Sequence, residues 1–417
     1  MKVQQLVPRA EEVDLEVVLA RLCGPSAYEF VSFAPEILQF CSSFSRALFH
    51  DSEAKRFPEL QALAFWMRSS ALERHRQEFE KLKSESTWLV PRGLVFHIPP
   101  ANVDTVFMYS WLLSVMAGNR NVLRISPRAA LQTTVICRLF NACLEGASEA
   151  MRSNTVMIRY GHERDVTAAI SALSDVRVIW GGDASVISLR SIPVPPHCKE
   201  LTFPDRYSLS VMRASKYLEA DVNVRLDLAA RFYNDTYWFD QMACSSPRLL
   251  IWYGGRKDCC AASDAFLQEL QDEIARRGYL TDTSGGMNKF TFLSRSILDE
   301  PVIAARRLDN QLIVAQVENI RQLRRDHCGG GFLFQHYSER FEDLAAHIVR
   351  KDQTLTYFGF DKSELMSFAR LLNGRGVDRI VPIGNALTFQ RYWDGYDLLA
   401  EMIRHVYIED IPSRQTL

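Results

Sequence analysis

Cys244 is the residue best placed to act as a nucleophile, in the segment FDQMACSSPR. Its small and polar neighbours, just before an apolar strand, indicate a turn whose backbone N–H groups can stabilise a thiolate. Most cysteines are instead buried and inert in apolar elements, and Cys137 and Cys143 fit that pattern. The segment indicates covalent catalysis by a thiolate, with a structural cysteine as the alternative.

Two further turns carry groups that such chemistry needs. Pro99-Pro100-Ala101-Asn102 joins a short apolar strand to an apolar helix, and Asn102 either caps that helix or donates its amide to a developing oxyanion. The turn Gly181-Gly182-Asp183 follows the strand VRVIW and lets backbone approach a cofactor phosphate. It is not a complete G-x-G-x-x-G fingerprint, so alone it indicates only a tight turn.

Other reactive residues have weaker cases. His97 stands alone in an apolar strand, where a hydrogen-bonded core residue is commoner than a base. Asp326-His327-Cys328 has no second pair of ligands at metal-binding spacing, and the following Gly329-Gly330-Gly331 predicts a mobile loop. Adjacent cysteines such as Cys259 and Cys260 rarely bind one metal ion together. No metal site is predicted.

Alternating strands and helices must position these residues. A strand at 93–98 is followed by a helix from about Val106, and the strands NVLRIS, TVMIRYG and VRVIW alternate with helices predicted at about 129–144 and 164–173. This order predicts a mostly parallel, doubly wound α/β sheet that binds ligands at the carboxyl ends of its strands. One long amphipathic helix is predicted upstream, over 58–83.

The character of the chain changes at about Tyr237. The cysteine turn leads into the strand RLLIWYGG and a long charged helix over 261–277, which predicts a smaller α/β catalytic domain. Near the end, GVDRIVPIG reads as strand and turn, and YDLLAEMIRHVYI as helix and strand. We therefore expect N-terminal helices and a cofactor-binding domain over 1–236, a catalytic domain over 237–390, and a segment over 391–417 that returns to the cofactor domain or serves oligomerisation.

Composition narrows the class of protein. The 417 residues carry a formal net charge of -1, which indicates no general attraction to nucleic acid or to an anionic membrane. Nine cysteines without secreted-scaffold spacing favour a reducing compartment. The acidic start lacks a secretory pattern, and the apolar run 106–117 is short of the roughly 20 residues that span a membrane. A cytoplasmic protein is expected.

In order and spacing these features resemble the aldehyde dehydrogenase superfamily. The matching places are Pro100-Ala101-Asn102, Gly118-Asn119, and VLRIS with Arg124 and Ser126, followed by the glycine turn and the cysteine loop. Within it the chain is similar to the long-chain acyl-CoA reductases known as the LuxC family. That likeness covers most of residues 90–400 and rests on GLVFHIPPANVDTVFMYSWLLSVMAGNRNVLRIS, FDQMACSSPR, DQTLTYFGF and GVDRIVPIGNALTFQRYWDGYDLL.

The resemblance implies reduction of a fatty acyl thioester to an aldehyde. Cys244 would take the acyl group while Asn102 and the Cys244 backbone N–H stabilise the oxyanion, and a nicotinamide cofactor would supply hydride. The implied cofactor-binding residues are Arg124, Ser126, Gly161, Gly181, Gly182 and Asp183. NADPH is preferred to NADH because guanidinium groups suit a 2′-phosphate and Arg120 and Arg128 are close in sequence, although both also fit a solvated loop and helix start.

The chain departs from hydrolytic aldehyde dehydrogenases in one respect. The segment LTFPDRYSLSVM offers no glutamate in an E-L-G-G type motif, and nearby Glu200 reads equally well as a surface residue. A missing water-activating base suits an acyl-transfer enzyme, which must protect its thioester from hydrolysis. An aldehyde dehydrogenase working in the oxidative direction, with coenzyme A or water as acyl acceptor, and a non-catalytic scaffold are the alternatives.

The sequence does not determine which acyl donor the protein uses or how long its acyl chain is. Acyl-CoA, an acyl carrier thioester and an acyl group handed over by a partner synthetase all fit, and a homo-oligomer is expected. The aromatic residues before Cys244 either line an acyl channel or pack in a core between domains; they are Phe232, Tyr233, Tyr237, Trp238 and Phe239.

Overall fold

The computed structural model describes residues 1–24, 30–100, 105–128, 130–299, 302–321 and 323–409. The chain folds into two compact units, Met1–Pro204 with Tyr396–Leu417, and Asp205–Gly395. The first boundary therefore lies at Pro204, not at the predicted 236. The physical reason is that the strand beginning at Tyr207 and the helices after it pack within the second unit's sheet and core.

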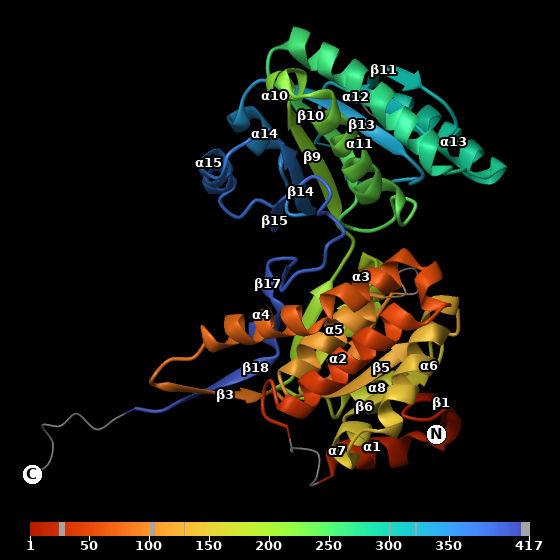
Figure 1. Ribbon diagram of the computed structural model, residues 1–417, viewed down its shortest axis with the longest axis vertical. Coiled ribbons are helices and arrows are strands. Elements are labelled where there is room, and N and C mark those ends of the chain that lie inside the picture. Colours follow the sequence, from red (N-terminus) through yellow and green to blue (C-terminus); the bar gives the residue numbers. More distant parts are fainter. Residues whose placement is uncertain (25–29, 101–104, 129, 300–301, 322, 410–417) are drawn as a thin grey trace, which may run out of the picture. The chain divides into compact units, whose positions relative to one another are not determined.

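The first unit is built on a seven-stranded sheet, shown in the lower part of Figure 1. Its order is β2 (Glu11–Asp14), β1 (Lys2–Val7), β6 (Thr155–Arg159), β5 (Arg120–Ile125), β4 (Leu94–Ile98), β7 (Val176–Trp180) and β8 (Lys199–Phe203). β1 pairs antiparallel with β2 and β6, and the other pairs are parallel. The predicted doubly wound parallel sheet is confirmed.

Helices cover both faces of this sheet. One face packs in a core with α1 (Leu15–Cys23), α8 (Arg164–Ser171) and α9 (Asp183–Arg190). The other carries α5 (Val106–Met116) and α6 (Leu131–Glu145), with α2 (Pro35–His50) outside them through Phe40, whose ring contacts Trp111 and Phe140. α7 (Glu149–Asn154) precedes β6, and a 3-10 turn (Ala54–Arg56) follows α2.

The helix predicted over 58–83 is instead two helices, α3 (Pro58–Trp66) and α4 (Ser69–Glu80). Arg68 is extended, with φ -65° and ψ 152°, and so interrupts the helical path. Serine competes for backbone hydrogen bonds within a helix but is favoured near its start, which explains why a new helix begins at Ser69.

The second unit has its own seven-stranded sheet, in the upper part of Figure 1. Its order is β11 (Val302–Arg307), β12 (Ile313–Val317), β13 (Phe332–Ser338), β10 (Pro247–Tyr253), β9 (Tyr207–Arg213), β14 (Asp352–Phe358) and β15 (Arg379–Pro382). Only the β11–β12 pair among these is antiparallel.

Two cores flank this second sheet. α10 (Ala214–Glu219), α11 (Val222–Tyr237) and α12 (Arg256–Arg277) pack on one face. α14 (Phe341–His347) and α15 (Lys362–Leu372) pack on the other, where Phe292 of α13 (Thr283–Asp299) also contributes. Figure 1 shows α14 and α15 on the side of the sheet opposite α11 and α12.

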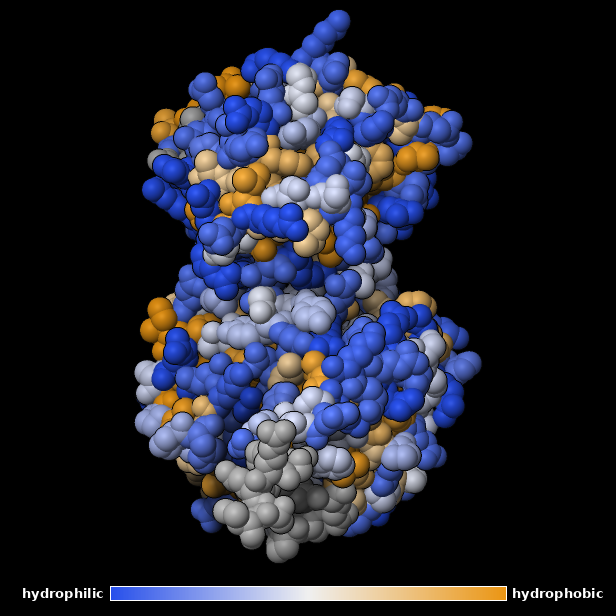
Figure 2. Space-filling model, turned by 90° about the vertical axis from the view of Figure 1, so that its left-hand side faces the viewer, coloured by the Kyte–Doolittle hydropathy of each residue, from blue (hydrophilic) through white to orange (hydrophobic). Residues whose placement is uncertain are grey.

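Short elements complete the fold. β16 (Tyr392–Trp393) pairs with β17 (Tyr396–Asp397), which α16 (Leu398–Glu401) follows. β18 (Ile403–Tyr407) pairs antiparallel with β3 (Thr87–Pro91), so the last described strand lies in the first unit. Hydrophilic residues cover most of the surface in Figure 2, with hydrophobic ones in small groups between them. In the described part of the chain, every helix is too short or too polar to cross a membrane.

Candidate active site

The turn that carries Cys244 lies at the amino ends of the second sheet's parallel strands. The Cys244 carbonyl accepts a hydrogen bond of 2.7 Å from Ser208 Oγ, near the start of β9. Gln241, fully buried, donates to the carbonyls of Pro247 at 2.9 Å and Phe332 at 3.0 Å, the first residues of β10 and β13. The turn is therefore tied to three neighbouring strands.

Cys244 is exposed to solvent, whereas Cys137 is buried. Burial of the surroundings raises the pKa of the Cys244 thiol, and the Arg248 guanidinium opposes that rise. The carboxylates of Asp394 and Asp205 raise the pKa further, while the backbone N–H of Arg206 favours the thiolate by hydrogen bonding. Cys244 is thus accessible, while Arg248 and the Arg206 N–H only partly offset the rise in its pKa that burial causes.

A buried ionic network lies near this cysteine. Arg206 pairs with Asp378, and its Nε is 3.9 Å from Asp394 Oδ1, which also accepts a hydrogen bond from Gln353. Burial raises the pKa of Asp394 to about 6. Arg206, Arg248 and Asp394 are not among the site residues predicted from the sequence, although Arg248 is the last residue of the segment FDQMACSSPR and Arg206 lies in LTFPDRYSLSVM.

The aromatic residues before Cys244 divide between two environments. Phe232, Tyr233 and Tyr237 belong to the core formed by α10, α11 and α12 within the second unit. Trp238 is 43% exposed and Phe239 is partly exposed. Core packing thus accounts for the first three aromatic residues, and only Trp238 and Phe239 are left as candidates to line an acyl channel.

The predicted cofactor residues gather at the carboxyl ends of the first sheet's strands. Ser126 follows β5, Gly161 comes just after β6, and Gly181 and Gly182 follow β7. Because β6, β5, β4 and β7 are parallel neighbours, these residues share one edge. Asn102, after β4 in the chain, lies outside the described residues.

Arg124 and Gly161 are brought into contact. The Arg124 guanidinium donates to the Gly161 carbonyl and lies 5.3 Å from the ring centroid of Tyr160. Its Nε is buried and has no hydrogen-bond partner in the described protein. A buried donor without a partner is costly, so this side chain retains capacity to bind a polar ligand.

The glycine turn has the space that a cofactor phosphate needs. Gly182 is the N-cap of α9 and makes no side-chain cap, and the N-terminus of a helix is a favourable place for an anionic phosphate. A Cβ on Gly182 would meet no atom within 4 Å, which leaves the approach open. Asp183, exposed, is the first residue of α9. These residues fit a dinucleotide, and Ser126 Oγ accepts a 3.2 Å hydrogen bond from the Arg128 N–H beside them.

Arg120 is not at this edge. It is the first residue of β5, it is only 4% exposed, and its guanidinium donates to the carbonyl of Leu22. The suggestion that Arg120 contacts a 2′-phosphate is therefore wrong, because Arg120 and Ser126 stand at opposite ends of the same strand. Arg128 is exposed and follows Ser126, so it is the arginine left for that role.

His97 and Glu200 have structural partners. His97 is fully buried, with Nδ1 2.7 Å from Ser110 Oγ and Nε2 3.0 Å from Asn121 Oδ1, and burial lowers its pKa to about 4. Glu200 accepts hydrogen bonds of 3.1 and 2.6 Å from fully buried Arg177. Both side chains are thereby engaged in the first unit's packing.

The Gly329-Gly330-Gly331 segment is a packed turn, not the mobile loop predicted from its composition. The Gly330 N–H donates to the Asp240 carbonyl at 2.8 Å, and the Gly331 N–H donates to Gln241 Oε1 at 3.0 Å. His327 is used inside the turn, where its Nδ1 accepts from the Gly329 N–H at 3.0 Å. No group of three or more metal-binding side chains occurs within the described ranges.

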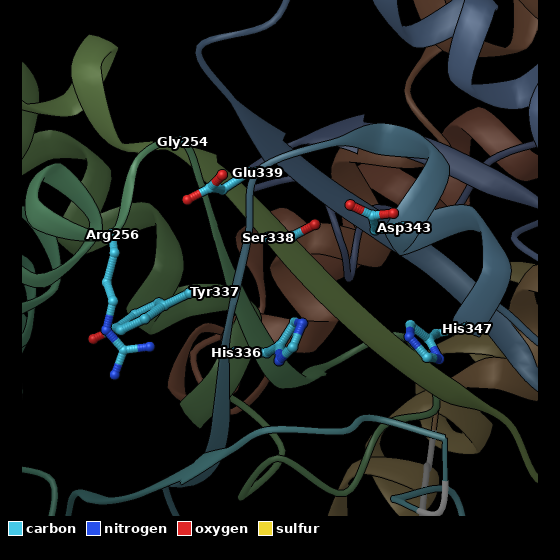
Figure 3. A pocket seen from close by; sticks show the side chains of 8 residues that line it. All are labelled: Gly254, Arg256, His336, Tyr337, Ser338, Glu339, Asp343 and His347. Carbon is cyan, nitrogen blue, oxygen red and sulfur yellow. The ribbon is translucent and has the colours of Figure 1, made fainter.

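A cavity of about 330 Å³ opens at the other end of the second sheet, after β10 and β13. Figure 3 shows Arg256 beside the ring of Tyr337, with His336 and His347 on the other side of the opening. Cys244 is not among its lining residues, which are Gly254, Arg256, His336, Tyr337, Ser338, Glu339, Asp343 and His347. This cavity is therefore separate from the cysteine turn.

Comparison with solved structures shows the aldehyde dehydrogenase fold. Aldehyde dehydrogenase 21 from Physcomitrella patens, solved with its reaction product succinate, matches with a TM-score of 0.69 at 10% identity, over all of this chain and 95% of that one. Betaine aldehyde dehydrogenase from Staphylococcus aureus, solved with NAD+, matches with a TM-score of 0.64 at 13% identity, over 96% of this chain and 88% of that one.

Sequence comparison narrows this fold to one family. A long-chain acyl-protein thioester reductase from Aliivibrio fischeri is 23% identical over 301 residues, 70% of this chain and 59% of the relative, so the chain spans about three fifths of that relative's length. The family model of acyl-CoA reductase (LuxC) matches residues 67–281, just over half of the chain. That range includes the cysteine turn and the described carboxyl-edge residues, and this chain belongs to the acyl-CoA reductase (LuxC) family.

Proposed function

We propose that this protein reduces a fatty acyl thioester to an aldehyde through an acyl-cysteine intermediate on Cys244, with NADPH as hydride donor. The observation that carries the proposal is an exposed cysteine in a turn tied to three strands, beside the Arg248 guanidinium and the Arg206 N–H, which oppose the rise in its pKa that burial causes. Family membership supports the same reaction class.

The proposed chemistry has two stages. The Cys244 thiolate attacks the thioester carbonyl, the carbon–sulfur bond of the donor breaks, and the donor thiol leaves with the proton that Cys244 lost. Asn102 and the Cys244 backbone N–H stabilise the oxyanion. Hydride addition to the acyl carbon and a proton from solvent then form a thiohemiacetal, whose carbon–sulfur bond breaks to release the aldehyde, with the hydroxyl proton passing to sulfur to restore the Cys244 thiol.

The first unit is proposed to hold the cofactor, whose nicotinamide supplies the hydride. Arg124 donates to the adenosine ribose, Ser126 accepts from it, and the backbone beside Gly161 lies against the cofactor. Gly181, whose N–H donates to the Phe203 carbonyl at 3.1 Å, precedes Gly182 and Asp183 at the start of α9, the helix end proposed to face its phosphates. Arg128 is the proposed contact for a 2′-phosphate, which makes NADPH the preferred cofactor.

The acyl donor is proposed to be acyl-CoA or an acyl carrier thioester. The relative from Aliivibrio fischeri is described as acting on acyl-protein thioesters, which favours testing a protein-bound acyl group as well as acyl-CoA. Supply by a partner synthetase, a cytoplasmic location and a homo-oligomeric assembly stay predictions.

The test is acylation followed by reduction. Purified protein is incubated with a labelled long-chain acyl-CoA, the mass added at Cys244 is measured, and NADPH is then supplied and aldehyde assayed. We expect stoichiometric label that NADPH discharges as aldehyde, with both signals lost in Cys244→Ala. Label retained by Cys244→Ala would reject Cys244 as the nucleophile, and aldehyde oxidation without acyl-CoA reduction would favour the oxidative alternative.

A further inference from the structure

Helix α13 has an unusual pattern of burial. Lys289 is 1% exposed, whereas Met287 and Phe290 are 68% and 63% exposed. Lysine is among the residues least often buried, because an ammonium group loses hydration on burial. A helix that buries this lysine while Met287 and Phe290 stay exposed therefore needs a specific reason for the lysine.

The Lys289 ammonium binds two uncharged oxygen atoms. Nζ donates to the Gly330 carbonyl at 2.5 Å and to Thr281 Oγ1 at 3.2 Å. Burial lowers the pKa of Lys289, while Cys328, Asp309 and Asp240 oppose that change. Hydrogen bonds from a charged donor are stronger than those between neutral groups, so the ammonium holds the Gly330 carbonyl firmly.

Gly330 belongs to a turn that interlocks with the turn before Cys244. Its N–H donates to the Asp240 carbonyl, and the next N–H, that of Gly331, donates to the buried side chain of Gln241. A Cβ added at Gly329 would lie 2.5 Å from the Asp240 carbonyl oxygen, which shows how closely the two backbones approach. Lys289 is thus linked to the cysteine turn through one peptide group.

The cysteine turn is strained at the residues that receive these bonds. Asp240 and Gln241 have φ values of 50° and 63°, in the left-handed region. Residues other than glycine are disfavoured in this region. Strain of this kind persists only where surrounding contacts over-determine the conformation. Here the contacts are the three hydrogen bonds of Gln241 and the turn that Lys289 holds.

We propose that Lys289 is a positioning residue for Cys244: its buried ammonium fixes the 329–331 turn, which fixes the turn that presents the sulfur. The proposal rests on the proposed function only in taking Cys244 as the nucleophile. Lys289 touches neither substrate nor cofactor in this role, so its loss should affect the rate of the chemical step more than binding.

The test uses substitutions that separate positioning from folding. Lys289→Met removes the ammonium at similar volume and leaves the Gly330 carbonyl without that donor. We expect kcat for thioester reduction to fall by about 10- to 100-fold, as a small misplacement of a reacting group does. KM should stay close to that of the wild type, the melting temperature should fall only slightly because one buried acceptor loses its partner, and Lys289→Arg should recover part of kcat.

A second readout needs no substrate. Alkylation of Cys244 by iodoacetamide, measured by peptide mass spectrometry, should slow about 10-fold in Lys289→Met, because a displaced sulfur loses the Arg206 N–H. Cys260, exposed on α12, is the internal reference, and Lys257→Met, an exposed lysine of the same helix, is the matched control. Cys260 in Lys289→Met, and Cys244 in Lys257→Met, should each be alkylated at the wild-type rate.

Three outcomes overturn the proposal: wild-type kcat in Lys289→Met, Cys244 alkylation as fast as in the wild type, or a loss of kcat matched by a loss of folded protein in both Lys289 variants. Failure of the proposed function is distinct from these, since it appears as wild-type protein that never carries an acyl group on Cys244. The alkylation comparison remains decisive in that case.

Discussion

The two seven-stranded sheets carry their candidate functional groups at opposite ends of their strands. In the first unit, Ser126, Gly161 and Gly182 follow parallel strands and lie at the carboxyl edge. In the second, Cys244 precedes β10 and is tied to the starts of β9 and β13, at the amino edge. The carboxyl-edge rule thus describes where the first unit places its candidate site and not where the second does.

The difference follows from what each edge offers. The carboxyl edge of the first sheet supplies the N-terminus of α9, whose positive dipole end suits an anionic phosphate. The amino edge of the second supplies a strained turn held by side chains such as Gln241, which suits the presentation of one sulfur atom. A dinucleotide is bound by groups spread along several strand ends, whereas a nucleophilic sulfur has to be held at one position.

The largest expected effect concerns the first unit's contribution to acylation. Asn102→Ala should lower the rate of Cys244 acylation by about 100-fold, as loss of one oxyanion donor does. The measurement is the single-turnover rate of label transfer from acyl-CoA, with cofactor binding as the control. An unchanged rate would remove Asn102 from the mechanism and leave the chemistry to the second unit alone.

The next prediction concerns pH and the first unit's core. Because the pKa of His97 in the folded state is about 4, below the unfolded value near 6.5, the unfolded chain binds a proton between these values that the folded chain does not. Stability should therefore fall as pH drops from 7 to 5, with His97 accounting for about 2 kcal/mol.

The measurement compares urea unfolding at both pH values for the wild type and His97→Gln, with exposed His50→Gln as the control. The His97 variant should lose less stability on acidification, because glutamine does not titrate. An equal loss in all three proteins would show that His97 does not carry the acid sensitivity.

A third prediction contrasts the two edges of the first sheet. Arg124→Met should raise KM for NADPH by about 10-fold, since a charged hydrogen bond contributes about 1.5 kcal/mol or more. Glu200→Gln should leave that KM unchanged, because Glu200 pairs with Arg177 in β7, away from the carboxyl edge. Equal KM values for the wild type and Arg124→Met would exclude Arg124 from cofactor binding.

The smallest expected effect is electrostatic and confined to the second unit. Arg248→Met should raise the pKa of Cys244, and Asp394→Asn should lower it, because these two side chains act on the thiolate with opposite signs. At pH 7 alkylation of Cys244 should therefore slow by about 3-fold in the first variant and quicken by about 3-fold in the second. A shift of both rates in one direction would indicate rearrangement of the turn instead.

The amino-acid sequence by itself was enough to predict several buried strands and the family. Apolar runs bounded by glycine and proline were enough to predict β4, β5, β6, β7 and β10, since these strands are buried along most of their length. The polar character of FDQMACSSPR separated Cys244, which is exposed, from Cys137, which is buried in the apolar helix α6.

Tertiary structure decided what depends on partners distant in the chain. Whether Arg120 faces a ligand or the carbonyl of Leu22 depends on which end of β5 it occupies and on what packs there. Glycine composition predicted mobility for 329–331, yet three positive φ values and the Asp240 carbonyl make it a packed turn. The burial of Lys289 could not be predicted from the sequence. It depends on hydrogen bonds to Gly330 and Thr281, which lie close to Lys289 only in the folded chain.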